Sequence, residues 1–284
     1  MAMRSDSASA AWPASHGAGA FLRALMLGAA VSAGAAMPAA VAGESGLPDT
    51  CLNAAPVEGA EARAEPGEPH VWRTATGGLL RQAELVSLAV DDPASVGPNA
   101  ETGAAGVRFV ALGEEMDRWQ RRPGHVMLSP GDRWLARELV RQGRAIVAPR
   151  LAARDCLAHL LKEEALARWR KAGLWAHERV WSAHDPEALS ERTGRYTLVA
   201  GRVISVGETR SMVYLNFGGR WSRDFTATIS AERKAAFADA GLDVTSLDGA
   251  AIRLRGMVRQ AGGPSIELVH PAQIERLDRN GDQR

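Results

Sequence analysis

The fold is decided by a stretch that begins with Asp117-Arg118-Trp119-Gln120-Arg121 and closes with Lys171-Ala172-Gly173-Leu174-Trp175. Between them lies a helical block that ends Glu138-Leu139-Val140-Arg141-Gln142-Gly143. Glycine readily adopts the left-handed conformation that follows a helix, so Gly143 is expected to end a short helix and Gly173 to stop a longer one. This half of the chain therefore predicts a sheet followed by two helices.

The longer helix is expected to start near Asp155 and to bury one continuous apolar face. Its apolar side chains are spaced at i, i+3, i+4, i+8 and i+12, which places them on one side of a helix. They are Leu157, Leu160, Leu161, Ala165 and Trp169. Core packing is also our interpretation of the tryptophans around the helices, which are Trp134, Trp169, Trp175 and Trp181.

A second unit begins near Gly194. Apolar alternation predicts strands around 198–206, 213–217 and 225–229, a helix from Ser230 to about Gly241, and further strands around 252–258 and 266–268. Three strands, a helix and two strands is the order expected of an OB-fold barrel. We therefore expect a mainly β protein with helices (α+β), built from two small OB-type barrels in tandem, the first with C-terminal helices.

Both ends of the chain are expected to lie outside these barrels. An apolar, small-residue run precedes Ala40-Val41-Ala42, so residues 1–42 are predicted to be a signal peptide that is cleaved near Ala42. The protein would then be periplasmic or secreted, and an uncleaved N-terminal anchor is the alternative. The remaining boundaries are a linker at 43–68, the first domain at 69–184, the second at 194–277 and a tail at 278–284.

The chain contains two cysteines, Cys51 and Cys156. In an oxidising compartment such a pair favours a disulfide. The bond would close a loop of roughly 105 residues and would stabilise the fold by about 4–5 kcal/mol in the chain-entropy model. Two free thiols, with Cys156 as a small buried helix residue, are the alternative.

The formal net charge is +1, so any affinity for nucleic acid must come from a local patch. One candidate patch lies on the predicted strand from Ile252 to Arg259, where period two places the arginines opposite the barrel core. Together with neighbouring aromatic residues they form the mixture that binds single-stranded nucleic acid. The candidate residues are Arg253, Arg255, Arg259, Trp221, Arg223 and Tyr214. The alternative is an ordinary solvated face, with Trp221 covering an open end of the barrel.

From about Val71 to Trp175 the chain resembles the staphylococcal nuclease (thermonuclease) family, most specifically in the second half. The segment Asp117-Arg118-Trp119-Gln120-Arg121 is similar to the family's Asp-x-Tyr-Gly-Arg, with Gln120 in place of the glycine. The resemblance implies a first barrel of staphylococcal-nuclease type and a remnant phosphate clamp at Arg121. A guanidinium suits that role because it matches phosphate oxygens bidentately.

Upstream, the same comparison finds most catalytic residues of the family missing. The segment Val90-Asp91-Asp92-Pro93-Ala94 is similar to the family's Val-Asp-Thr-Pro-Glu. This implies that Asp91 is a calcium ligand and that Ala94 stands at the general-base position. The family's other arginine would fall at Val86, and the Asp-Gly-Asp-Thr hairpin with the second calcium aspartate has no counterpart. Calcium needs several oxygen ligands, and hydrolysis needs a base.

The sequence thus predicts a catalytically degenerate nuclease fold. We expect an exported protein that binds single-stranded nucleic acid or another polyanion with weak or no hydrolysis and without a cofactor. The first alternative is an active Ca²⁺-dependent phosphodiesterase that uses Arg121, Asp91 and a substitute carboxylate. The second alternative is a structural or protein-interaction module of the cell envelope.

Overall fold

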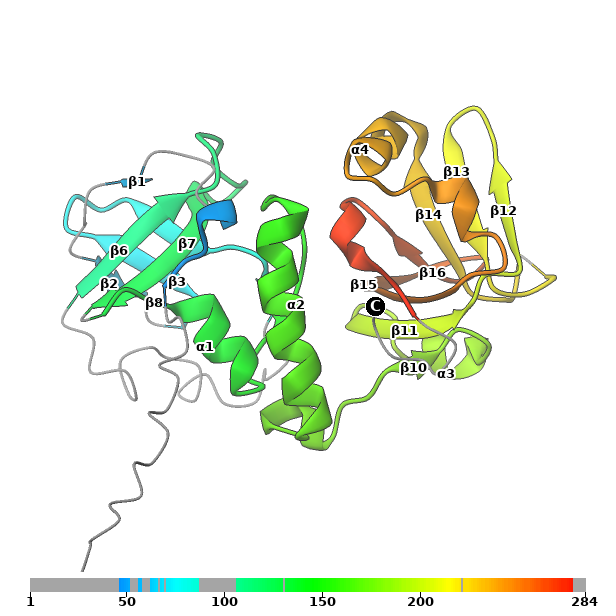
Figure 1. Ribbon diagram of the computed structural model, residues 1–284, viewed down its shortest axis with the longest axis horizontal. Coiled ribbons are helices and arrows are strands. Elements are labelled where there is room, and N and C mark those ends of the chain that lie inside the picture. Colours follow the sequence, from blue (N-terminus) through cyan, green and yellow to red (C-terminus); the bar gives the residue numbers. More distant parts are fainter. Residues whose placement is uncertain are drawn as a thin grey trace, which may run out of the picture. The chain divides into compact units, whose positions relative to one another are not determined.

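The computed structural model describes residues 46–51, 56–57, 62–65, 67–68, 70–86, 106–129, 131–220 and 222–277. In these residues the protein is mainly β with few helices, which confirms the predicted α+β class (Figure 1). No helix in these ranges has the length and apolar character that a membrane crossing requires.

The first sheet is formed by the alternating stretches of the N-terminal half. Its strands are β1 (Pro56–Val57), β2 (Ala62–Ala64), β3 (Val71–Thr74), β4 (Leu79–Gln82), β6 (Gly106–Ala111), β7 (Arg121–Ser129) and β8 (Arg133–Trp134). They pair in the order β1-β6-β7-β4-β3-β2, with β8 also on β7. β4 and β7 are parallel, so segments far apart in the sequence become neighbours. Trp72, Phe109 and Trp134 lie in its buried core.

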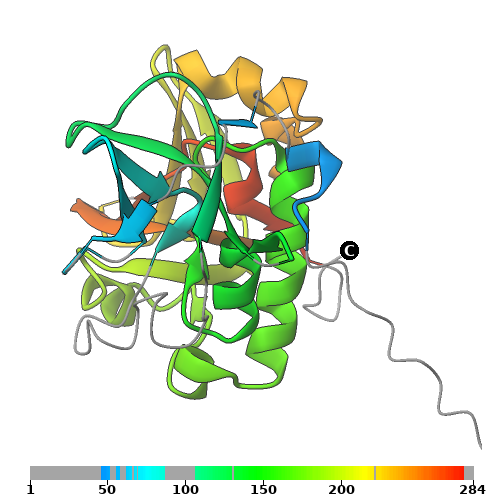
Figure 2. The same ribbon diagram turned by 90° about the vertical axis from the view of Figure 1, so that its left-hand side faces the viewer.

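Helices α1 (Leu135–Arg141) and α2 (Arg154–Trp169) lie side by side and share this core (Figures 1 and 2). Between them, β9 (Ile146–Val147) pairs with β5 (Leu85–Val86) in a small separate sheet. Gly143 has a φ of 66° directly after α1, as predicted. Helix α2 ends before Gly173, because Lys171 takes the left-handed conformation there with a φ of 54°.

The predicted apolar face of α2 is buried over its first half alone. Leu157 and Leu160 are completely buried, but Trp169 at the C-terminal end is 81% exposed. Glu164 is completely buried instead, since charged partners surround it. The interpretation of Trp169 as a core residue is therefore wrong, whereas that of Trp134 and Trp175 is confirmed.

The second sheet follows the predicted order of strands and helix. Its strands are β10 (Trp181–Ser182), β11 (Tyr196–Arg202), β12 (Ser205–Glu208), β13 (Met212–Asn216), β14 (Thr226–Ser230), β15 (Ala251–Ala261), β16 (Gly263–Glu267) and β17 (Ile274–Arg276). The short helices are α3 (Pro186–Ser190) and α4 (Lys234–Asp239), and α4 stands between β14 and β15. The strands pair in the order β10-β11-β15-β16-β14-β13-β12, with β17 on β15, and β14 and β16 are parallel. Phe225, Leu254 and Ile266 lie in its buried core.

Buried charges join α2 to the second sheet within one compact unit, Ala42–Arg284. Arg255 of β15 is completely buried, and its Nη1 lies 2.9 Å from both carboxylate oxygens of Glu164 in α2. Its Nη2 donates to Glu275 of β17. Arg255 Nη1 and the Tyr196 hydroxyl also donate to the carbonyl of Val147, at 3.2 and 3.3 Å.

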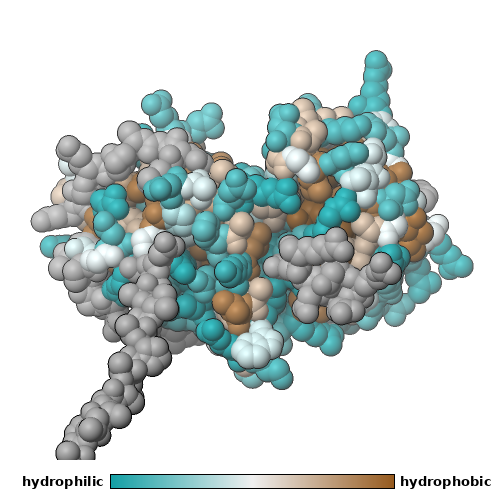
Figure 3. Space-filling view, in the orientation of Figure 1, coloured by the Kyte–Doolittle hydropathy of each residue, from teal (hydrophilic) through white to brown (hydrophobic). Residues whose placement is uncertain are grey.

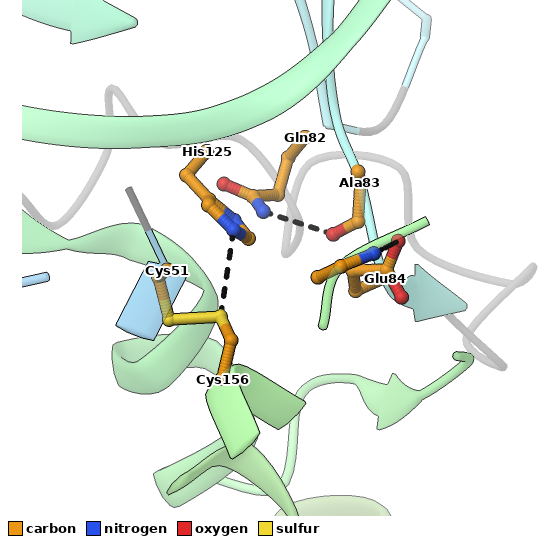
Figure 4. Close-up of a disulfide and its surroundings, with 7 residues drawn as sticks. Cys51, Gln82, Ala83, Glu84, His125 and Cys156 are labelled. Carbon is orange, nitrogen blue, oxygen red and sulfur yellow. Dashed lines mark hydrogen bonds between the residues drawn. A yellow bond between two sulfur atoms is a disulfide. The ribbon is translucent and has the colours of Figure 1, made fainter. Parts of the chain in front are cut away.

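The predicted disulfide between Cys51 and Cys156 is present and joins the 3-10 turn at Asp49–Cys51 to α2 (Figure 4). Both cysteines are completely buried. The ring of His125 lies beside them, with Nε2 at 3.7 Å from Cys156 Sγ, and packs edge-on against Trp134 with ring centroids 5.0 Å apart. The disulfide therefore belongs to the core of the first sheet.

His125 and His70 are buried histidines whose pKa values lie far below the ordinary value. Burial lowers the pKa of each to about 4, and at His70 the nearby Arg144 and Arg81 add to the effect. In the unfolded chain both imidazoles return to an ordinary pKa of about 6.5, so unfolding takes up protons between about pH 6.5 and pH 4. The free energy of unfolding therefore falls as the pH falls through this window.

Replacement of His125 by glutamine is expected to flatten this pH dependence by about one proton, which is ~1.4 kcal/mol per pH unit. Urea denaturation at several pH values between about 6.5 and 4 measures the slope. His159→Gln, at an exposed position of α2, is the control and should leave the slope unchanged. An equal slope in His125→Gln and in the parent protein would contradict a depressed pKa at this site.

Candidate functional site

Arg121 is the first residue of β7, and Asp117 in the preceding loop holds its side chain. The Asp117 carboxylate accepts the backbone N–H groups of Trp119 and Arg121 at 2.9 and 3.0 Å, and the Nε–H of Arg121 at 2.9 Å. Partial burial raises the pKa of Asp117, but these hydrogen bonds outweigh burial and hold the pKa below its ordinary value. Asp117 is therefore ionised at neutral pH.

A second guanidinium, that of Arg81, reaches the same carboxylate. β4 runs parallel to β7, with Leu79 opposite Arg121 and Arg81 opposite Pro123. Arg81 Nε lies 3.3 Å from Asp117 Oδ2, the oxygen that also accepts from Arg121 Nε. The side chains of Arg81 and Arg121 are 21% and 15% exposed. Burial lowers the pKa of Arg81 against the opposing effect of Asp117, but an arginine stays cationic at neutral pH.

The outer nitrogens of these two guanidiniums are largely free to bind a ligand. Arg121 Nη1 donates to Glu68 at 3.2 Å, and Glu68 is 55% exposed. Within the described ranges, no acceptor bonds to Nη2 of Arg121 or to either Nη of Arg81. Charged N–H donors of this kind bind the oxygens of phosphate and carboxylate groups.

An exposed tryptophan lies beside the paired arginines. Trp119 is 54% exposed, and the Cζ atoms of Arg118 and Arg121 lie 3.9 and 4.5 Å from its ring centroid. Gln120 has a φ of 58°, a conformation that glycine adopts more readily than glutamine. We call Arg81, Asp117, Trp119 and Arg121 the arginine-pair site. It combines donors for an anion with an exposed indole ring.

The sequence comparison did not identify Arg81. It assigned the family's other arginine to Val86, which pairs with Ile146 in the β5–β9 sheet. The available signal was an arginine within the apolar run Leu79-Leu80-Arg81, but its approach to Arg121 depends on the parallel pairing of β4 with β7. Asp91, the predicted calcium ligand, lies outside the described residues.

The predicted arginine face of β15 is not an open surface. Arg255 is completely buried between Glu164 and Glu275, and the side chain of Arg253 is 11% exposed and pairs with Glu275 at 3.2 Å. Arg259 alone of the three is well exposed, at 64%, and it pairs with Glu267 at 2.8 Å. The expectation of a shared solvent-facing row is therefore wrong, because carboxylates of α2 and β17 occupy the side of β15 opposite the barrel core.

Tyr214 and Arg259, two of the predicted binding residues, line one cleft of about 890 Å³ on the second sheet. Arg259 and Glu208 in its wall are neutralised by Glu267 and Lys234, at 2.8 and 2.7 Å. The remaining wall is largely hydroxyl, amide and apolar groups, so the cleft has no excess of positive charge. Its residues are Gly207, Glu208, Thr209, Met212, Tyr214, Asn216, Thr226, Thr228, Arg259, Gln260, Ala261, Ser265 and Glu267.

The other two predicted binding residues of this domain are Arg223 and Trp221. Arg223 is 61% exposed and pairs with Glu187 at 2.9 Å. Trp221 is outside the described residues. Among the described residues, the one group of three side chains with metal-ligand atoms in reach of each other is Cys51, His125 and Cys156. Its sulfur atoms are joined in the disulfide, and calcium binds oxygen ligands, so this group is not a calcium site.

No protein-family model matches the chain, and no curated protein matches it as a relative.

Proposed function

We propose that this protein binds phosphate-bearing chains, with single-stranded nucleic acid as the ligand class, at the arginine-pair site, with weak or no hydrolysis. The observation that carries the proposal is the contact of two largely buried arginine side chains with one carboxylate oxygen, at 3.3 and 2.9 Å. Their remaining donors and the exposed indole of Trp119, which already lies against the guanidiniums of Arg118 and Arg121, match a phosphate group next to a planar base.

The proposal includes two OB-type barrels, the first of thermonuclease type. The strand order of the two sheets supports this, because both follow one scheme. In the first sheet β1 and β2 are the two halves of strand 1, and β3, β4, β6 and β7 are strands 2 to 5, so the order is 1-4-5-3-2-1. In the second sheet β11 and β12 are the two halves of strand 1, and β13, β14, β15 and β16 are strands 2 to 5, which gives the same order from β11 to β12. In both sheets the parallel pair joins the third and fifth strands. The position of α4 between the third and fourth strands also supports an OB-type second barrel.

Export to the periplasm or beyond is part of the proposal. A buried disulfide supports it, because such bonds form and persist in oxidising compartments. Weak hydrolysis is proposed because the residue aligned with the family's general base is Ala94, which cannot accept a proton. An arginine pair without a base holds a phosphate group but does not activate water.

The test is binding of a fluorescently labelled single-stranded oligonucleotide, followed by anisotropy at several salt concentrations. Arg121→Ala is expected to weaken binding by about 10- to 100-fold, the loss of a charged hydrogen bond, and to reduce the salt slope by about one. The matched control is Arg108→Ala, which removes an arginine from β6 of the same sheet, where it pairs with Asp132 at 3.2 Å. Arg108→Ala should bind as the parent protein does.

Two results would contradict this function. Absence of oligonucleotide binding at low ionic strength would favour an interaction module of the cell envelope. Calcium-dependent cleavage that disappears in Arg121→Ala would establish a phosphodiesterase, and the claim of degeneracy would then be wrong.

A further inference from the structure

The C-terminal end of α2 borders a second cavity, which shares no residue with the arginine-pair site. Its volume is about 720 Å³, within the usual range for small-ligand pockets. Helix α2, the segment after it and β15 contribute its wall. The lining residues are Ala165, Arg168, Trp169, Lys171, Trp175, Glu178, Arg179, Val180 and Arg253. Figure 3 shows a small hydrophobic patch beside paler residues at this end of α2, with hydrophilic residues around it.

The wall of this cavity carries an excess of positive charge. Of its described lining residues, Arg168, Lys171, Arg179 and Arg253 are cationic, and Glu178 is acidic. Glu178 is already engaged, because both of its oxygens lie 3.3 Å from Nη2 of Arg192. An anionic group that enters the cavity therefore does not have to displace Glu178 from the cations of the wall.

Two of these cations have no acidic partner. Arg168 pairs with Glu164 at 2.5 Å and Arg253 with Glu275 at 3.2 Å. Over the described part of the chain, the side chains of Lys171 and Arg179 form no ion pair or hydrogen bond, and Arg179 lies over the ring of Trp181 with its Cζ 4.2 Å from the centroid. Both side chains are exposed, so both are available to a ligand.

The unsatisfied polar groups of the wall are all donors. Trp175 is 4% exposed, and its Nε1–H has no acceptor in the described structure. The Nε–H of Arg253 is also buried without an acceptor there. A buried donor without an acceptor is destabilising, so the cavity favours an acceptor-rich ligand. Phosphate and carboxylate oxygens supply such acceptors.

The aromatic component is Trp169, whose indole is 81% exposed at the rim. Trp175 lies in the same wall, and the Cζ of Arg168 is 5.6 Å from its ring centroid. A large apolar ring left in water next to a cationic cavity offers a stacking surface for a planar heterocycle. Cationic donors and an exposed aromatic face thus occur together, as at the arginine-pair site but on other elements.

We propose that this cavity binds a nucleoside phosphate, with the base stacked on Trp169 and the phosphate held by Arg179 and Lys171. Such a ligand is an acceptor-rich anion attached to a planar ring. Its phosphate oxygens complement the cations and unpaired donors of the wall, and its base complements the exposed indole. The ligand can be a free nucleotide or one unit of a nucleic-acid chain. The inference stands independently of the arginine-pair site, because the two sites share no residue.

The experiment is isothermal titration calorimetry of the full mature chain with adenosine monophosphate, and in parallel with adenosine, inorganic phosphate and a short oligodeoxyadenylate. Trp169→Ala is expected to weaken adenosine monophosphate binding by roughly 5- to 100-fold, the usual effect of losing one stacked base. Arg179→Gln is expected to weaken it by about tenfold or more. Adenosine and phosphate alone should each bind more weakly than the nucleotide.

Leu166→Ala is the matched control, since it removes an exposed apolar side chain of the same helix that does not line the cavity. It should leave adenosine monophosphate binding unchanged, and Arg121→Ala measures any share of the binding that belongs to the arginine-pair site, so failure at one site can be told from failure at the other. Oligodeoxyadenylate binding that depends on Trp169 would identify the ligand as part of a polymer, and binding of the mononucleotide alone would identify a free nucleotide. The proposal is overturned if neither probe binds at low ionic strength, or if Trp169→Ala and Arg179→Gln bind them as the parent protein does.

Discussion

Replacement of Arg255 by methionine is expected to lower the free energy of unfolding by about 3–5 kcal/mol, the usual cost of leaving a buried charge without its partner. Arg255 and Glu164 are completely buried, since both side chains are 0% exposed. Methionine keeps much of the side-chain volume, so the loss reports the charge more than a cavity. Urea denaturation of the parent protein and the variant measures the difference.

The size of this effect follows from how many elements Arg255 joins. Its guanidinium binds Glu164 of α2, Glu275 of β17 and the carbonyl of Val147 in β9. Burial raises the pKa of Glu275, but Arg255 and Arg253 outweigh it and hold the pKa below the ordinary value. In Arg255→Met the carboxylates of Glu164 and Glu275 lose their shared cation while still shielded from water. The contact between α2 and the second sheet is then weakened together with β17.

The control for this prediction is Arg259→Met on the same strand. Arg259 is 64% exposed and pairs with a partly exposed Glu267, so its loss should change the free energy of unfolding by less than about 1 kcal/mol. A second check is Arg255→Met combined with Glu275→Leu, which should cost less than the sum of the two single changes, because each removes the other's unpaired charge. A loss below about 1 kcal/mol in Arg255→Met alone would show that the network does not stabilise this fold.

Arg255 also shows which part of the structure the sequence could predict. Alternation along Ile252–Arg259 correctly separates the core residues of β15 from its arginines, since period two is a local property of a strand. The alternation does not predict which residues pack against the arginine side of the strand. Glu164, which pairs with Arg255, belongs to a helix almost a hundred residues earlier, and its register against β15 depends on tertiary packing. A charged residue within an otherwise apolar helix face was the available signal.

The core assignment of Trp169 is wrong, and Arg81 is not identified from the sequence, for related reasons. The helical spacing that includes Trp169 is real, but the partner surface for α2 ends before the helix does, so its last aromatic residue is exposed. Arg81 reaches Arg121 through a parallel strand pair, and no local pattern predicts which distant strands pair. Strands, helices and the disulfide follow from short-range patterns and from cysteine count. The charged sites depend on which of these elements become neighbours.

Removal of the Cys51–Cys156 disulfide is expected to lower the free energy of unfolding strongly. The Cys51→Ala/Cys156→Ala variant should lose about 4–5 kcal/mol of unfolding free energy, since the bond closes a loop with a sequence separation of 105. Alanine is the better replacement because both sites are completely buried, and a serine hydroxyl there would need a partner. Urea denaturation should also show a larger m-value, because the unfolded chain without the bond exposes more surface.

The parent protein unfolded in the presence of a dithiol reductant is the matched comparison for this variant. Reduction breaks the same bond but keeps both sulfur atoms in the core, so it should reproduce most of the loss in free energy and the whole rise in m-value. Any further loss in the alanine variant then measures the packing of the sulfurs against His125, whose Nε2 lies 3.7 Å from Cys156 Sγ (Figure 4). If reduction and substitution each lower the free energy of unfolding by less than about 1 kcal/mol, the bond between the Asp49–Cys51 turn and α2 does not stabilise the fold. A loss confined to the alanine variant would instead assign the stabilisation to buried sulfur contacts and not to loop closure.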